Sequence, residues 1–97
     1  MKDFIFLMHA DTTSPERDED WEPYIGRLIE AGCFQGGSSI GQGQAFSKEG
    51  DAAPLTRQLS GYIKIQAESL EGACAALEGN PTYEAGGMVE IRELVEG

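Results

Sequence analysis

Near the start of the chain, five consecutive apolar residues constrain the fold more than any other sequence feature: Phe4-Ile5-Phe6-Leu7-Met8. Side chains alternate between the two faces of a strand, so Phe4, Phe6 and Met8 share one face and Ile5 and Leu7 the other. Strands that are apolar on both faces are usually central and buried on two sides. The chain must therefore cover both faces of the sheet that contains this strand.

Two amphipathic helices are predicted after this strand. The first begins near Asp20 and ends at Gly32, with Pro23 in its first turn and a short turn before it near residues 15–18. Its apolar residues recur at intervals of three and four: Trp21, Tyr24, Ile25, Leu28 and Ile29. The second is capped by Ser69 and stopped by Gly79-Asn80-Pro81. Its predicted inner stripe is Leu70, Ala73, Cys74 and Leu77.

Three further segments favour extended structure. The glycine-rich stretch 33–46 is typical of a twisted, bulged strand or a hairpin, and residues 47–58 read as a polar loop. Residues 62–67 alternate, with Ile63, Ile65 and Ala67 on one face. In the last strand, residues 88–92, Val89 and Ile91 face opposite to Met88, Glu90 and Arg92.

The resulting order is strand, helix, strand, strand, helix, strand. This split βαβ pattern predicts an α+β fold, a ferredoxin-like sandwich whose antiparallel sheet has two helices on one face. With 97 residues, 40% of them hydrophobic and 25% charged, we expect a single globular domain over 1–97.

Two helices cannot cover both sheet faces, so one apolar set of the first strand lies opposite them. Burying three large apolar side chains contributes about 1.5–3 kcal/mol each, a sum that rivals the ~5–15 kcal/mol stability of a whole domain. A second copy packed sheet against sheet would cover this face, and two-fold dimers are the commonest oligomers. We therefore predict a homodimer.

Charge and cysteine content exclude several classes of protein. Seventeen acidic and seven basic residues give a net charge of −10, which disfavours nucleic-acid and membrane-surface partners. The apolar run is shorter than a signal-peptide core or a membrane span, so we expect a cytoplasmic protein. Cys33 and Cys74 form no CxxC or zinc spacing and are expected to be reduced core residues, with a disulfide as the alternative.

No metal or cofactor site is predicted. The acidic residues at 16–20 suit the start of a helix, and a cation site there is the lesser alternative.

His9, the single histidine, lies where the first strand ends, two residues before Asp11. A neutral imidazole oriented by a carboxylate can act as a general base near pH 7, so His9 and Asp11 are the candidate catalytic pair. A hydrogen-bonded structural histidine is the alternative.

Five polar residues are predicted on the strand faces that point away from the helices: Tyr62, Lys64, Gln66, Glu90 and Arg92. Inside a dimer they could line a pocket for a small anionic or phenolic ligand. The alternative is ion pairing among themselves, such as Lys64 with Glu90, because an unpaired buried charge is costly. Trp21 and Tyr24 are expected in the core or, alternatively, in an aromatic pocket wall.

These residues favour a cofactor-independent lyase or isomerase acting on a small cyclic compound. His9 would be the base, and Arg92 or Lys64 would stabilise developing oxyanion charge. The alternative is a non-catalytic homodimer that binds a small molecule or a protein. Redox chemistry at Cys33 ranks last, since no basic residue lies near it in the sequence.

Several segments, taken in order, resemble the YCII-related proteins, especially the branch named for an Asp-Gly-Pro-Phe motif. They are His9 after the first strand, Ser14-Pro15-Glu16, the helix with Trp21 and Tyr24, Ala31-Gly32-Cys33-Phe34-Gln35-Gly36-Gly37, Gly61-Tyr62-Ile63, Ala73, Asn80-Pro81 and Gly86-Gly87-Met88-Val89-Glu90-Ile91-Arg92. The resemblance spans nearly the whole chain. It implies a dimeric α+β barrel with pockets between sheet and helix, close to monooxygenase-like and muconolactone-isomerase-like barrels.

The resemblance also implies a chemistry. A few members of this family are linked to dehydrochlorination of a chlorinated hydroxyhydroquinone, with a histidine and an aspartate as the proposed catalytic pair. In this chain Trp21 stands where that histidine is expected, and the motif loop reads Gly50-Asp51-Ala52-Ala53-Pro54-Leu55. The missing histidine favours the non-catalytic alternative, whereas the polar strand faces favour the enzyme.

Overall fold

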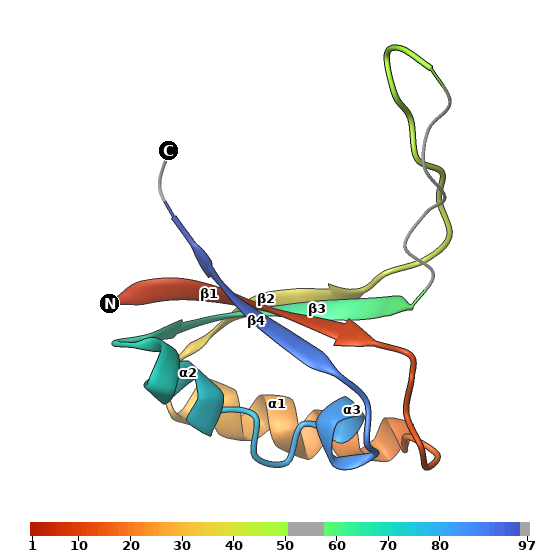
Figure 1. Cartoon of the computed structure of the whole chain (residues 1–97). Coiled ribbons are helices and arrows are strands. Elements are labelled where there is room, and N and C mark those ends of the chain that lie inside the picture. Colours follow the sequence, from red (N-terminus) through yellow and green to blue (C-terminus); the bar gives the residue numbers. More distant parts are fainter. Residues whose placement is uncertain (51–57, 96–97) are drawn as a thin grey trace.

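A four-stranded antiparallel sheet with helices on one face forms the body of the molecule in a computed structural model, which describes residues 1–50 and 58–95 (Figure 1). The strands are β1 (Lys2–His9), β2 (Phe34–Ser39), β3 (Leu59–Ala67) and β4 (Val89–Leu94), and they lie in the order β2-β3-β1-β4. This order confirms the predicted ferredoxin-like α+β fold.

The central position predicted for the first strand is confirmed, since β1 pairs with both β3 and β4. Phe4, Phe6 and Met8 are buried in the core under the helices, and Ile5 and Leu7 lie on the opposite face, which we call the outer face. The side chains left without helical cover are thus two, not three. Burying these two side chains against a second copy would contribute about 3–6 kcal/mol, which is less than the sum for three side chains in the dimer prediction.

The first helix, α1 (Trp21–Glu30), follows a short 3-10 helix at Asp18–Asp20. Tyr24 and Leu28 are buried against the sheet, as predicted. The chain then turns at Gly32, whose φ of +74° favours glycine. Ile29 is 59% exposed, so its place in the predicted inner stripe is wrong.

The second helical region differs from its prediction. Ser69 caps α2 (Leu70–Ala75) by accepting a bond from the Gly72 backbone N–H at 3.1 Å, as expected. Instead of stopping a longer helix, Asn80 starts a further one, α3 (Pro81–Glu84), by accepting from the Tyr83 N–H at 3.1 Å.

Because α2 is so short, its predicted inner stripe is only partly correct. Ala73 is fully buried, whereas Leu70 and Cys74 are exposed. Cys33 is half-buried, and both cysteines are free thiols. The prediction that both are core residues is therefore wrong for Cys74, and the alternative of a disulfide is not supported.

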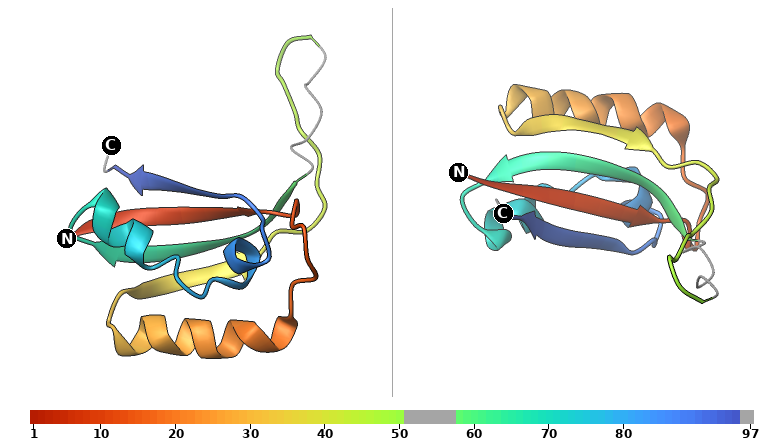
Figure 2. Two further views of the ribbon diagram at one scale, coloured as in Figure 1. Left: turned by 60° about the horizontal axis from the view of Figure 1, so that its bottom comes forward. Right: turned by 90° about the horizontal axis from the view of Figure 1, so that it is seen from above.

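The glycine-rich stretch forms the bulged edge strand β2, whose register shifts between Phe34 and Gly36. At Gly37, β2 and β3 approach each other closely, since a Cβ at this position would lie 2.6 Å from the Tyr62 carbonyl oxygen. After β2, residues 40–50 extend away from the sheet on the side opposite the helices (Figures 1 and 2). Residues 51–57 of the predicted polar loop, and with them most of the motif loop, lie outside the described residues.

Candidate functional site

A pocket of about 470 Å³ lies between α1 and the β2–β3 side of the sheet, and we call it the α1–sheet pocket. It is bounded by the chain leading into α1, by α1 itself, by both strands and by α3. The polar and aromatic residues among its lining are Thr12, Glu16, Asp18, Trp21, Phe34, Ser38, Ser39, Ser60, Tyr62 and Thr82. Its volume falls in the range of small-molecule sites, ~300–1,000 Å³.

The carboxylate of Glu16 is held in this pocket by two hydrogen bonds. The Trp21 indole N–H donates to Oε1 at 2.9 Å, and the hydroxyl of Thr82 donates to Oε2 at 3.1 Å. Thr82 is fully buried, so this anchor is fixed by the fold. Each carboxylate oxygen can accept further bonds. Glu16 is thus an oriented acceptor with capacity left for a ligand.

The charge of the pocket restricts what it can bind. Glu16 and Asp18 are acidic, and none of the lining residues in the described part of the chain is Lys, Arg or His. An anionic ligand would have to enter against two carboxylates without a counter-charge, which is unfavourable. A neutral ring with hydroxyl groups suits the site better, because it can donate to carboxylates and stack beside Trp21.

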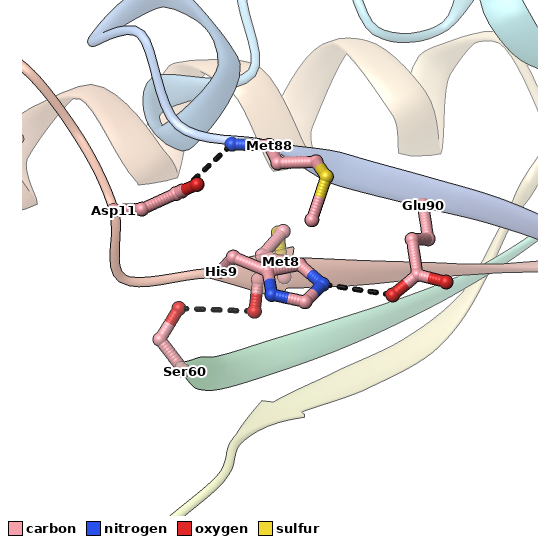
Figure 3. A network of polar contacts seen from close by, with 6 residues as sticks. All are labelled: Met8, His9, Asp11, Ser60, Met88 and Glu90. Atoms are coloured by element: carbon pink, nitrogen blue, oxygen red, sulfur yellow. Dashed lines mark hydrogen bonds and ion pairs between the residues drawn. The ribbon is translucent and has the colours of Figure 1, made fainter. Parts of the chain in front are cut away.

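His9 lies on the outer face, away from this pocket. It is 6% exposed, and its Nε2 lies 2.8 Å from Glu90 Oε2 (Figure 3). Since a carboxylate can only accept, Nε2 is the protonated nitrogen. Nδ1 is buried without a hydrogen-bond partner among the described residues.

The predicted pairing of His9 with Asp11 is not what the structure contains. The Asp11 side chain is exposed and accepts from the Met88 backbone N–H at 2.9 Å (Figure 3). This contact ties the end of β1 to the start of β4. Glu90 is therefore the carboxylate that orients His9.

The five polar residues predicted to point away from the helices do share the outer face. Lys64 and Arg92 flank Ile5 from either side of β1, and Tyr62 and Glu90 flank Leu7 in the same way. Gln66 donates from its amide to Asp3 at 3.2 Å. The structure thus groups these residues on one surface with His9.

The alternative pair of Lys64 with Glu90 is not formed. These residues belong to strands on opposite sides of β1, and Glu90 contacts His9 instead. Among the described residues, neither Lys64 nor Arg92 takes part in an ion pair.

Of the predicted site residues, only Trp21 and Tyr62 line the α1–sheet pocket. Trp21 is half-buried and packs edge-on against Tyr24, with ring centroids 6.0 Å apart. It thus combines the two expected roles, core packing and a pocket wall. Sequence reasoning missed Glu16, which it assigned to the acidic helix start, and Thr82, for which no local pattern gave a signal.

The described residues contain no group of three or more His, Cys, Asp or Glu side chains arranged to hold a metal ion. Within the same part of the chain, no helix has the length and apolar character needed to cross a bilayer.

Fold and pocket define a small α+β protein with a four-stranded antiparallel sheet, helices on one face and a ligand-sized pocket between α1 and the sheet. Among solved structures, the chain is similar to the 5-chloro-2-hydroxyhydroquinone dehydrochlorinase TftG from Burkholderia phenoliruptrix AC1100, in complex with 2,5-dihydroxybenzoquinone. The TM-score is 0.61 at 16% sequence identity, over 100% of this chain and 96% of that one. Neither a scan against protein-family models nor a search of curated proteins gave a match. At this identity the similarity establishes the fold.

Proposed function

We propose that this protein is a homodimeric, cofactor-independent lyase or isomerase that binds a small, neutral, hydroxylated ring compound in the α1–sheet pocket. The observation that carries the proposal is the Glu16 carboxylate, held beside Trp21 by two hydrogen bonds inside a pocket of ligand size. The structurally similar 5-chloro-2-hydroxyhydroquinone dehydrochlorinase, in complex with 2,5-dihydroxybenzoquinone, supports the choice of a ring compound.

In this proposal Glu16 is the general base. Its carboxylate takes a proton from the bound ring, and the electron pair left behind either expels a leaving group as an anion or is reprotonated at another carbon. General-base catalysis requires the base within hydrogen-bond reach of that proton, and the bonds from Trp21 and Thr82 supply the orientation. Pocket hydroxyls, such as that of Ser39, are available to donate to a developing oxyanion.

Base catalysis by His9 would instead place the chemistry on the outer face. Glu90 occupies Nε2 of His9, and Nδ1, the nitrogen left to accept a proton, is buried, so this role stays a prediction for a ligand that reaches Nδ1. Loss of turnover in His9→Ala with an unchanged melting temperature would support it.

The homodimer in this proposal uses the outer face. Ile5 and Leu7 lie there without helical cover, in the centre of the sheet and flanked by polar residues. An apolar centre with a polar rim is the usual composition of an interface.

Binding without turnover is the second candidate. The single histidine lies outside the α1–sheet pocket, and both Glu16 oxygens already accept hydrogen bonds. Such a site could hold a ring without moving a proton.

Trp21 is the only tryptophan and lines the pocket, so its fluorescence reports occupancy. We expect hydroxyhydroquinone, titrated without oxygen, to quench it in the wild-type protein. Glu16→Gln removes the charged acceptor and should raise the Kd about 10- to 100-fold, the value of a hydrogen bond to a charged group. Glu19→Gln is the matched control, because Glu19 is exposed nearby and does not line the pocket.

Equal Kd values for wild-type protein and Glu16→Gln would contradict the proposed binding mode. Chloride release from a chlorinated hydroxyhydroquinone then separates the two candidates. Release that is lost in Glu16→Gln supports the lyase, whereas saturable binding with no release supports the binding module.

A further inference from the structure

Residues 40–50 form an arm that leaves β2 and stands clear of the body on the outer-face side (Figures 1 and 2). Its base is tied to β3 by the Ile40 N–H, which donates to the Ser60 carbonyl at 2.9 Å. Most of the arm is glycine, glutamine and other small or polar residues. Phe46 interrupts this composition and is 84% exposed.

A single exposed aromatic residue is ordinary on a protein surface. Phe46 differs because it belongs to residues 40–50, a segment that leaves the body on the side of the sheet that no helix covers. We propose that the arm reaches across to a second copy of this chain, so that each Phe46 is buried against the partner. This inference rests on the homodimer of the proposed function.

The charge of the outer face favours a second copy as the occupant. Four charged residues lie on its strands, Asp3 and Glu90 against Lys64 and Arg92, so the face sums to zero while the whole chain carries −10. Two copies can therefore meet here without bringing their excess negative charge into contact. Charges of both signs on one face also allow two-fold related copies to pair opposite charges.

The area of the sheet gives an independent reason for the arm. Four strands spaced ~4.8 Å apart and about seven residues long present a face of roughly 450 Å². A stable dimer buries about 800 Å² per partner. The sheet alone falls short of this value, and an arm of eleven residues with an exposed aromatic ring supplies additional contact.

Sedimentation equilibrium of the full chain tests the proposal. We expect Phe46→Ser to raise the dimer Kd roughly 100- to 10,000-fold, because each dimer loses two buried phenylalanines. Ile29→Ser is the matched control, since Ile29 is 59% exposed on α1 and should leave the Kd unchanged. Phe46 lies outside the core, so circular dichroism should show an unchanged fold.

A wild-type dimer whose Kd is unaffected by Phe46→Ser would overturn the role of the arm and leave the homodimer standing. A wild-type chain that stays monomeric at 100 µM would overturn both the role of the arm and the homodimer. The Trp21 fluorescence titration tests ligand binding in the α1–sheet pocket independently of the dimer. Photo-crosslinking gives a direct second readout. With p-benzoylphenylalanine in place of Phe46, we expect a crosslinked two-chain product; its absence in a protein that dimerises would also overturn the proposal.

Discussion

The His9 imidazole is a buried group whose stability contribution depends on one acceptor, the Glu90 carboxylate. Glu90→Ala leaves the Nε2–H without a described partner, and an unsatisfied buried donor costs about 1–3 kcal/mol. We expect the free energy of unfolding, measured in urea, to fall by that amount. Glu90→Gln should cost less, because the amide oxygen can still accept.

Glu93→Ala is the control for this measurement. Glu93 lies on the same strand, but its ion pair with Lys2 is long, at 3.9 Å, and exposed. Pairs of this kind contribute between about 0 and 1 kcal/mol. Similar losses of unfolding free energy in Glu90→Ala and Glu93→Ala would show that the buried His9–Glu90 contact stabilises the fold no more than an exposed ion pair does.

These residues also show how far sequence reasoning reaches. His9 and Glu90 could both be picked out from the sequence, but their pairing could not, because it depends on the register that sets Leu7 opposite Glu90. Asp11 is closer in sequence, but the chain leaves the strand after His9 and its carboxylate turns to Met88. Glu16 was overlooked for a similar reason, since Thr82 reaches it from 66 residues away.

At the scale of elements, Tyr24 joins α1 to the end of α2. Its hydroxyl donates to the Ala76 carbonyl at 2.7 Å, and its ring is almost fully buried. Burial raises the pKa of Tyr24 above its ordinary value of 10.0; an electrostatic interaction with Cys33 adds to this, while the Asn80 side chain and the charge of Arg27 oppose it. The folded chain therefore holds this proton more tightly than the unfolded chain does.

The raised pKa of Tyr24 makes the stability of the fold depend on pH. Stability from the protonated Tyr24 is fully present below pH 10, and it declines above pH 10 because the unfolded state ionises first, with a limiting slope of about 1.4 kcal/mol per pH unit. Tyr24→Phe should lose about 0.5–1.5 kcal/mol at pH 7 and show a smaller decline between pH 9 and pH 11. Urea unfolding at each pH measures both. Tyr83→Phe, at a half-exposed tyrosine, should keep the wild-type slope, and an identical slope in Tyr24→Phe would contradict the assignment.

Most elements of the fold could be predicted from the sequence, because each has a local cause. Alternating apolar residues predicted β3, and the stripe with Tyr24 and Leu28 predicted α1. The short helix α3 could not be foreseen, since the residues that end one helix, Asn80-Pro81, are equally suited to begin another. Only its packing decides between them, through the buried Asn80 and Thr82 side chains.

At the scale of the whole molecule, the net charge of −10 opposes the proposed dimer, whereas the neutral outer face favours it. Two copies repel each other through their acidic surfaces, and salt screens this repulsion over about 10 Å at 0.1 M ionic strength. Raising NaCl from 20 to 200 mM should therefore tighten the wild-type dimer.

Reversing one charge on the outer face separates local from overall electrostatics. Lys64→Glu changes the chain from −10 to −12 and the outer face from zero to −2, so like charges meet across the interface. Since like-charge contacts cost several kcal/mol, we expect the dimer Kd to rise at least about 10-fold in 20 mM NaCl and to recover partly in 500 mM. Arg17→Glu makes the same change in net charge at an exposed position outside the sheet, and it should shift the Kd by less than about 3-fold. If both variants weaken the dimer equally, the overall charge controls association and the copies do not meet through the outer face.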